Sequence, residues 1–223
     1  MSAGIRVKFQ GSTIAISTAF ANVSPNDSIA SVTKANPAVV TETLHGRVTG
    51  DVIKIDDAAG MTELNDRIYV IERIDANSYK LLGVDSSAYG TYTSGGKVYA
   101  TTFSNFCELK GYNRQGAASP ELDATTICSE AAEYETGLPD FGTTQLDFNF
   151  APRTAIQQAI ASFYNGDNAG QQIAVRIDLP NSRGRMVQIG TIQQTSEQAA
   201  VNQLWTGSLT IRNTGKRYDF DAA

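Results

Sequence analysis

The side chains of this 223-residue chain that could perform acid–base chemistry are concentrated in one short stretch. Two carboxylates held close together can act as general acid and as nucleophile or base in the hydrolysis of a glycosidic bond. Six acidic residues stand between positions 121 and 140: Glu121, Asp123, Glu130, Glu133, Glu135 and Asp140. No pocket-forming residues flank them, and such an acidic loop is usually solvated or part of an interface. We therefore do not expect an enzyme.

The other reactive side chains are isolated from one another. His45 could serve as a general base, but a lone histidine beside Gly46 and a turn is typical of a hydrogen-bonded loop residue. Cys107 and Cys128 lack CxxC spacing and lie far from His45. We expect them to be buried thiols in a reducing cytosol, with no metal site, disulfide or cofactor.

The charged residues indicate association rather than recognition of nucleic acid. Arg183 and Arg185 flank a hairpin turn and could clamp a phosphate or form a polar tip, but two arginines make no basic stripe.

The net charge is −5 and is unevenly spread along the chain. Residues 108–147 carry eight acids and two bases, and residues 151–223 carry seven bases and five acids. If identical subunits meet head to tail, this asymmetry favours their contact; a solvated acidic loop is the alternative.

Composition places the chain among soluble globular proteins. Hydrophobic residues make up 41% and charged residues 18%, and no apolar run is long enough to cross a bilayer. The first residues, MSAGIRVKFQGSTIAIS, have basic residues among alternating apolar ones, so they do not resemble a signal peptide. We expect no membrane insertion and no export.

One strand and one helix stand out by their periodicity. In residues 143–150, Leu146, Phe148 and Phe150 alternate with the polar residues Gln145, Asp147 and Asn149, which is typical of a strand buried on one face. The next stretch, about 152–164, is predicted to be a short α-helix that starts at Pro152 and stops at a left-handed Gly166.

The remaining pattern predicts a mainly β protein of two domains. Short β runs are expected at 29–33, 38–41, 52–55, 68–74, 79–82 and 97–100, and they indicate a small β-barrel inserted at 26–103. Residues 1–25 and 104–223 then form a discontinuous β-sandwich or barrel covered by the helix. Its strands are expected at 13–18, 106–113, 122–128, 143–150, 173–179, 186–193 and 203–212; Trp205, Leu209 and Ile211 share the inward face of the last one.

The loop from 115 to 139 is too long for a compact domain unless something orders it. We expect neighbouring subunits to do so. The residues assigned to this inter-subunit loop are Pro120, Glu121, Leu122, Asp123, Glu133, Tyr134 and Glu135.

From Phe106 onward the order of motifs resembles the major tail tube protein of siphophages, a lambda-like tail tube family. The motifs are FCELKGYN, RQGAASPELDATT, ICSEAAEYETGLPDFG with the aromatic strand, NFAPRTAIQQAIASFYNG, IAVRIDLPNSRGRMVQIGTI and LWTGSLTIRNTG. They cover about half of the chain. The resemblance implies a structural virion protein whose hexameric rings stack into a hollow tube.

The family's biology supplies further expectations. Double-stranded DNA would pass through the tube during ejection without specific binding, and the partners would be further copies, a tape-measure protein, a tail terminator and tail tip proteins. The protein would lie in the virion tail and assemble in the bacterial host cytoplasm. Gln145, Asp147 and Asn149 would then face the lumen, where carboxylates repel phosphate; Arg183 and Arg185 gain a third possible role in contacting the next ring.

The inserted segment resembles the module named after the first catalytic cysteine half-domain of ubiquitin-activating enzymes. The motifs, in order, are His45-Gly46, TGD at 49–51, GMTELN at 60–65 and GVDSS at 83–87. Neither cysteine lies in the insertion, so no nucleophile for thioester chemistry is present there. The resemblance implies an ornament on the outside of the particle. Two alternatives remain: a host-surface carbohydrate-binding decoration module, and a tube component of a secretion or tailocin-like machine.

Overall fold

The computed structural model describes residues 8–21, 28–116 and 118–221, and it is mainly β with one α-helix, as the sequence predicts. The strands that pair in one large sheet follow the order β2-β3-β6-β5-β4-β7-β1-β12-β13-β14-β11-β8, and β15 pairs with β13. Their bounds are β1 (Thr13–Ala21), β2 (Ser31–Val32), β3 (Val39–Thr41), β4 (Val52–Ala59), β5 (Arg67–Arg73), β6 (Ser78–Leu81), β7 (Ser94–Asn105), β8 (Leu109–Arg114), β11 (Thr143–Asn149), β12 (Gln172–Asp178), β13 (Arg185–Gln198), β14 (Thr206–Asn213) and β15 (Tyr218–Phe220). The other elements are the separate pair β9 (Glu121–Asp123) and β10 (Tyr134–Thr136), the 3-10 helix η1 (Thr62–Leu64) and the helix α1 (Ala155–Asn165).

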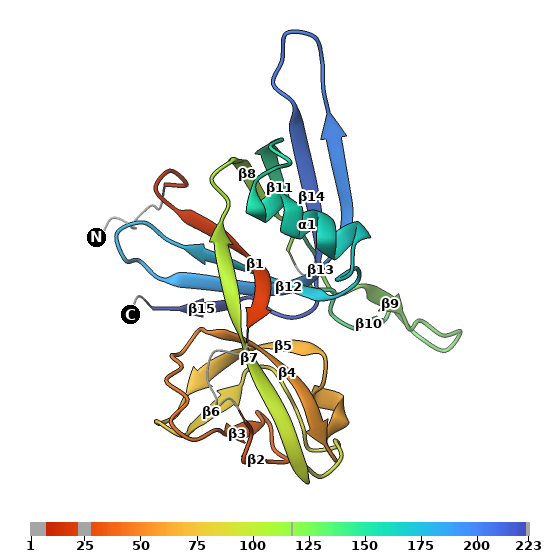
Figure 1. The fold of residues 1–223 in the computed structure, drawn as a ribbon. Helices are drawn as coiled ribbons and strands as arrows, with labels where there is room; N and C mark the ends of the chain where they lie inside the picture. Colours follow the sequence, from red (N-terminus) through yellow and green to blue (C-terminus); the bar gives the residue numbers. More distant parts are fainter. Residues whose placement is uncertain (1–7, 22–27, 117, 222–223) are drawn as a thin grey trace, which may run out of the picture.

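Strand β7 runs through both halves of the sheet (Figure 1). Residues 94–100 of β7 pair with β4, and residues 100–105 pair with β1. The predicted boundary between residues 103 and 104 therefore falls inside a continuous strand. The division into an outer domain (1–25 and 104–223) and an inserted domain (26–103) stays a prediction, because the single strand β7 pairs with strands of both parts.

Two clusters of buried apolar side chains lie on either side of the point where β7 passes from its pairing with β4 to its pairing with β1. The first draws on residues 29–98 and includes the fully buried Ile53, Ile71, Tyr79 and Leu81. The second gathers strand residues beneath α1; its members are Ile14, Ile16, Phe106, Leu146, Phe148, Ile156, Ile160, Phe163, Ile173, Val175, Ile177, Leu209 and Ile211. Burial of a large apolar side chain is worth about 1.5–3 kcal/mol, so each cluster is a substantial core.

A third cluster joins the two. Val52, Ile68 and Val70 come from β4 and β5, whereas Ala174 and Val187 come from β12 and β13. All five side chains are buried. The segment predicted as an insertion is thus packed on the rest of the chain through an apolar contact, not merely tethered to it.

The helix starts later than predicted and ends at the predicted glycine, which has another conformation than expected. It begins at Ala155, because Thr154 is its extended N-cap and the Gln157 side chain accepts a hydrogen bond from the Ala151 N–H at 2.8 Å. It ends at Asn165 with Gly166 as its C-cap, where the stop was predicted, but the φ of Gly166 is −106°, so the expected left-handed conformation is wrong. A Cβ on Gly166 would lie 2.9 Å from the Ser162 Cα, and close approach to the backbone explains the glycine.

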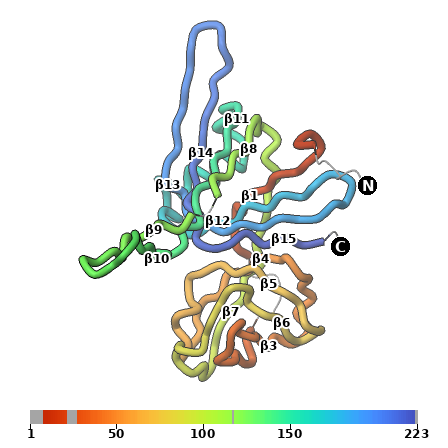
Figure 2. Tube along the Cα trace, turned by 180° about the vertical axis from the view of Figure 1, so that it is seen from behind, coloured from red at the N-terminus to blue at the C-terminus, as the bar shows by residue number. Residues whose placement is uncertain are grey.

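Two hairpins project from the body of the molecule (Figures 1 and 2). One is formed by the outer ends of β13 and β14 and is called the long arm (residues 193–206). The other carries β9 and β10, which pair only with each other among the described strands, and is called the acidic arm (residues 118–140). Strands β10 and β15 and the helix η1, each three residues long, were absent from the sequence prediction.

Candidate assembly surfaces

Strand β11 separates an apolar face from a polar one. Thr144, Leu146 and Phe148 are buried, and Leu146 and Phe148 belong to the cluster that includes the α1 side chains. Gln145, Asp147 and Asn149 alternate with them, are half-buried, and therefore lie on the face opposite the helix. The Gln145 amide donates a hydrogen bond to the Asp147 carboxylate at 3.0 Å.

The register of the neighbouring strands extends this face. Gln145, Asp147 and Asn149 lie opposite Thr210, Ser208 and Thr206 of β14, which lie opposite Gln194, Ser196 and Gln198 of β13. We call these nine residues the polar face. Asp147 is its one charged member. The six residues of β14 and β13 were not predicted from the sequence. Residues 206–212 alternate in the same way, but only their apolar positions were assigned to a face.

The acidic arm holds all seven residues predicted for the inter-subunit loop. Pro120, Glu121, Leu122, Asp123, Glu133, Tyr134 and Glu135 are exposed. Part of the predicted loop is a two-stranded hairpin, in which Tyr134 pairs with Asp123 and Glu135 with Leu122. The strand expected at 122–128 ends at Asp123, where the Thr125 N–H bonds to the carboxylate and turns the chain.

Two carboxyls of the acidic arm have a lowered pKa, whereas the general acid of a hydrolytic pair needs a raised one. A hydrogen bond from Thr125 lowers the pKa of Asp123. The Gly142 N–H, and then Arg212, lower the pKa of Asp140, which forms a 2.8 Å ion pair with Arg212. This ion pair anchors the base of the arm.

Large apolar side chains are exposed on both arms. The acidic arm presents Leu122, Ile127, Tyr134 and Leu138, and Ile127 and Leu138 are almost completely exposed. The long arm presents Val201, Leu204 and Trp205. Trp205 is 50% exposed and packs on Phe150 with ring centres 4.9 Å apart, so the prediction that it shares the inward face is wrong. It precedes β14, and only Leu209 and Ile211 point into the core.

His45, Cys107 and Cys128 each lie in a loop or turn. His45 accepts a hydrogen bond from the Arg47 N–H at 2.9 Å and packs edge-on against Tyr79, as expected of a loop residue. Cys107 and Cys128 are both exposed, so their predicted burial is wrong: one follows the buried Phe106 in a turn and the other lies in the loop of the acidic arm. Residues 8–21, 28–116 and 118–221 hold no cluster of potential metal ligands.

At the tip of the hairpin between β12 and β13, Arg185 is engaged locally. Arg185 forms a 2.6 Å ion pair with Asp178, and Arg176 contacts the same carboxylate at 3.1 Å. This arrangement favours a polar tip over a phosphate clamp. The described part of the chain also has no helix long and apolar enough to span a membrane.

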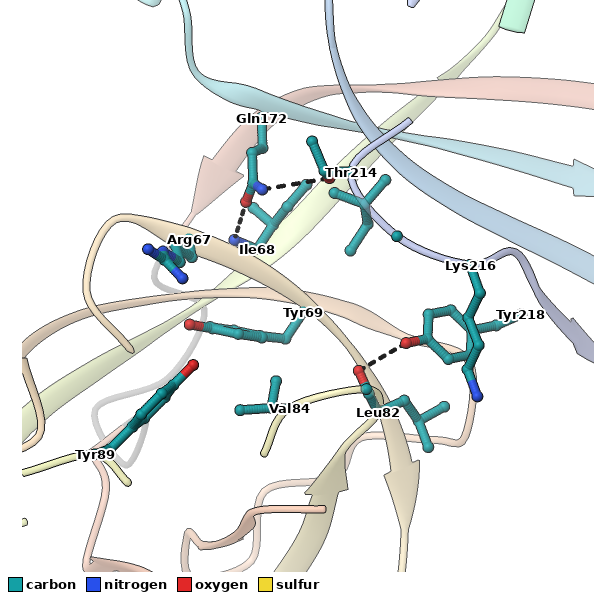
Figure 3. Close-up of a pocket in the computed structure, with 13 residues that line it drawn as sticks. Arg67, Ile68, Tyr69, Leu82, Val84, Tyr89, Gln172, Thr214, Lys216 and Tyr218 are labelled. Carbon is teal, nitrogen blue, oxygen red and sulfur yellow. Dashed lines mark hydrogen bonds between the residues drawn. The ribbon is translucent and has the colours of Figure 1, made fainter. Parts of the chain in front are cut away.

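A pocket that no sequence pattern indicated lies where the two buried cores meet (Figure 3). This junction pocket has a volume of about 190 Å³ and is lined by Arg67, Ile68, Tyr69, Leu82, Gly83, Val84, Tyr89, Gln172, Ile189, Thr214, Gly215, Lys216 and Tyr218. Gln172 bridges the two sides: it accepts a hydrogen bond from the Ile68 N–H at 3.1 Å, and its amide lies 3.5 Å from the Thr214 hydroxyl. The pocket could not be predicted from the sequence, because its lining residues come from two segments of the chain more than 80 residues apart.

Two phenols of the junction pocket are already engaged as donors. Tyr69 donates to the Leu64 carbonyl at 3.0 Å, and Tyr218 donates to the Leu82 carbonyl at 2.9 Å. Burial raises the pKa of both phenols, so they stay protonated. Their rings therefore contribute apolar surface, and the charge of the pocket comes from Arg67 and Lys216 alone.

Comparison with known proteins gives a match for part of the chain. Residues 35–101 match the family model of the ubiquitin-activating enzyme E1 FCCH domain. This range lies within the predicted insertion and agrees with the resemblance of its motifs. Cys107 and Cys128 lie outside the match.

Two solved structures are similar to about half of the chain. The SPP1 tail tube is 13% identical with a TM-score of 0.42, over 54% of this chain and 69% of that chain. The tail of an empty GTA particle with C6 symmetry is 14% identical with a TM-score of 0.42, over 54% of this chain and 87% of that chain. At these values the likeness transfers no function. No curated protein matches the chain significantly.

Proposed function

We propose that this protein is a non-enzymatic structural subunit of a phage tail tube, and that it works by polymerising. The observation that carries the proposal is the polar face on β11, β14 and β13, whose β11 and β14 strands are backed by an apolar core on their other side. A sheet of this kind can line an aqueous channel while its own core holds its shape.

The chemistry of the polar face suits the passage of double-stranded DNA. Phosphates bind to arginine and lysine, and the nine residues include neither. Asp147 adds negative charge, which repels phosphate. Amides and hydroxyls keep the wall hydrated, so Gln145, Asp147 and Asn149 are proposed to face the lumen.

The edges of the sheet and the two arms provide surfaces for assembly. β8 is the last strand of the large sheet, and an open strand edge is a template for pairing with another chain. Exposed apolar residues on the arms, such as Ile127 and Leu204, are of the kind that neighbouring subunits cover. We propose closure of sheets into hexameric rings that stack into a tube in the virion tail, assembled in the host cytoplasm. A tape-measure protein, a tail terminator and tip proteins would be its other partners.

Electron microscopy of the purified protein at increasing concentration tests the proposal. Hollow tubes or closed rings are expected, with six subunits per ring in rotational averages. A persistent monomer that binds glycans on an array would refute the proposal and support a carbohydrate-binding module.

A further inference from the structure

We propose that the acidic arm of one copy docks into the junction pocket of a second copy, so that the segment around residues 35–101 takes part in assembly. This inference rests on the proposed function, because it assumes head-to-tail contacts between identical subunits. Such contacts need two different surfaces on each chain. The acidic arm and the junction pocket are two such surfaces.

The acidic arm carries one sign of charge. Residues 115–139 contain five acidic residues and no lysine or arginine. Among them Leu122, Ile127, Tyr134 and Leu138 expose large apolar side chains. The arm is fixed at its base by the Asp140–Arg212 ion pair and extends away from its own body (Figure 2). These side chains are therefore presented to another molecule.

The junction pocket carries the opposite sign. Arg67 and Lys216 are its only charged lining residues, and they lie toward opposite ends of it, with Tyr69 between them (Figure 3). Neither forms an ion pair with another described residue, whereas the adjacent Asp66 is paired with Lys54 at 3.0 Å. Aromatic rings flanked by two cations suit an apolar side chain flanked by carboxylates.

The sizes of the two surfaces also agree. A cavity of about 150 Å³ holds a benzene molecule, so the junction pocket, at about 190 Å³, can take one large side chain of the arm. Opposite charges around such an anchor fix its register and favour fast association. Because Arg67, Tyr69 and Tyr89 come from one side of the pocket and Lys216 and Tyr218 from the other, the site is complete only when both parts of the chain are present.

Disulfide trapping tests the contact, since Cys128 is an exposed thiol in the loop of the acidic arm. Gly215→Cys adds a thiol in the pocket, where a Cβ meets no atom within 4 Å, and Cys107→Ser removes the other natural thiol. Mild oxidation of the C107S/G215C variant is expected to give a ladder of trimers and larger species on a non-reducing gel. The matched control is Ala76→Cys in the same C107S background, which places the thiol in the exposed turn after β5, at the far end from Arg67. It is expected to give at most dimers.

Charge reversal gives a second readout. In the C107S/G215C background, Arg67→Glu with Lys216→Glu should reduce the ladder at least tenfold, and adding Glu133→Lys with Glu135→Lys should restore it. All four side chains are exposed, so folding is retained and can be verified by circular dichroism.

The outcomes separate this inference from the proposed function. Tubes without a ladder, a ladder equal to that of the control, or dimers alone would overturn the arm–pocket contact while leaving the tube proposal in place. A charge-dependent ladder without tubes or rings would support the contact and refute the tube.

Discussion

At the scale of single residues, Glu42 and Arg47 form a buried ion pair. Glu42 is fully buried, and its carboxylate accepts hydrogen bonds from Arg47 at 2.8 and 3.2 Å and from the Tyr79 hydroxyl at 2.6 Å. Burial, followed by the charge of Glu42, raises the pKa of Tyr79, so the phenol remains a donor. A buried charge is tolerated only when such partners satisfy it.

Arg47→Met is therefore expected to destabilise the fold by about 3–5 kcal/mol, because it leaves Glu42 charged and buried without its cation. Urea denaturation followed by tyrosine and tryptophan fluorescence measures the loss. Replacing both partners, with Glu42→Leu and Arg47→Met, should restore much of the stability. A loss below about 1 kcal/mol in the single variant would contradict a buried-charge role.

The two faces of β11 make a matched pair of substitutions possible. Leu146→Ala should cost about 2–5 kcal/mol, since Leu146 is fully buried beneath α1 and a cavity would remain. Gln145→Ala, one position away on the polar face, should change the free energy of unfolding by less than about 0.5 kcal/mol. If denaturation showed that both variants lose the same free energy of unfolding, the two faces would contribute equally to stability and the assignment would be contradicted.

At the scale of elements, the register of three strands shows that Gln145, Asp147 and Asn149 are part of a larger polar surface. Alternation within residues 143–150 was enough to assign Gln145, Asp147 and Asn149 to one face. It did not show which strands continue that face. The pairing of β11 with β14 and of β14 with β13 supplies this information, and the first of these pairings joins segments about 60 residues apart.

Lysine on the polar face is expected to make the assembled tube retain DNA. Asp147→Lys with Ser208→Lys places two cations opposite each other on β11 and β14 and turns repulsion of phosphate into attraction. Co-sedimentation of tubes with short DNA duplexes should increase, and it should weaken with added salt. Asp147→Asn with Ser208→Thr is the neutral control. Unchanged co-sedimentation of intact lysine tubes would place this face away from the lumen.

The helix shows what local pattern can and cannot predict. Its position and its apolar stripe follow from the spacing of Ile156, Ile160 and Phe163, which all become buried. Its start does not, because it depends on Thr154 and Gln157, and neither does the conformation of Gly166, which depends on its close approach to Ser162. Pro152 remains in the connection before the helix.

At the scale of the whole molecule, the junction between the two cores changes the meaning of the insertion. An ornament could be removed without consequence. Val52, Ile68 and Val70 instead cover Ala174 and Val187, and Tyr218 donates to the Leu82 carbonyl across the junction. The segment thus shields part of the outer core from water.

Deletion of residues 28–99 is expected to make the remaining chain aggregate. A short linker can close the gap, since Ala21 pairs with Ala100 in the β-ladder, but Val187 and Ile189 lose their apolar cover. Size-exclusion chromatography should show soluble aggregates. Adding Val187→Thr and Ile189→Thr to the deletion should recover a monomer-sized peak. A soluble deletion variant with unchanged apolar residues would support the role of an ornament.

The sequence by itself determined the mainly β class, the position of the helix α1, and the apolar and polar faces of β11. These properties follow from the local period of side chains and from turn residues, which act over a few positions. Only the tertiary structure decided the exposure of Cys107 and Cys128, the environment of Glu42, the extended polar face and the junction pocket. Each of these depends on which distant strands pack together, and packing and register are set by contacts across the whole chain.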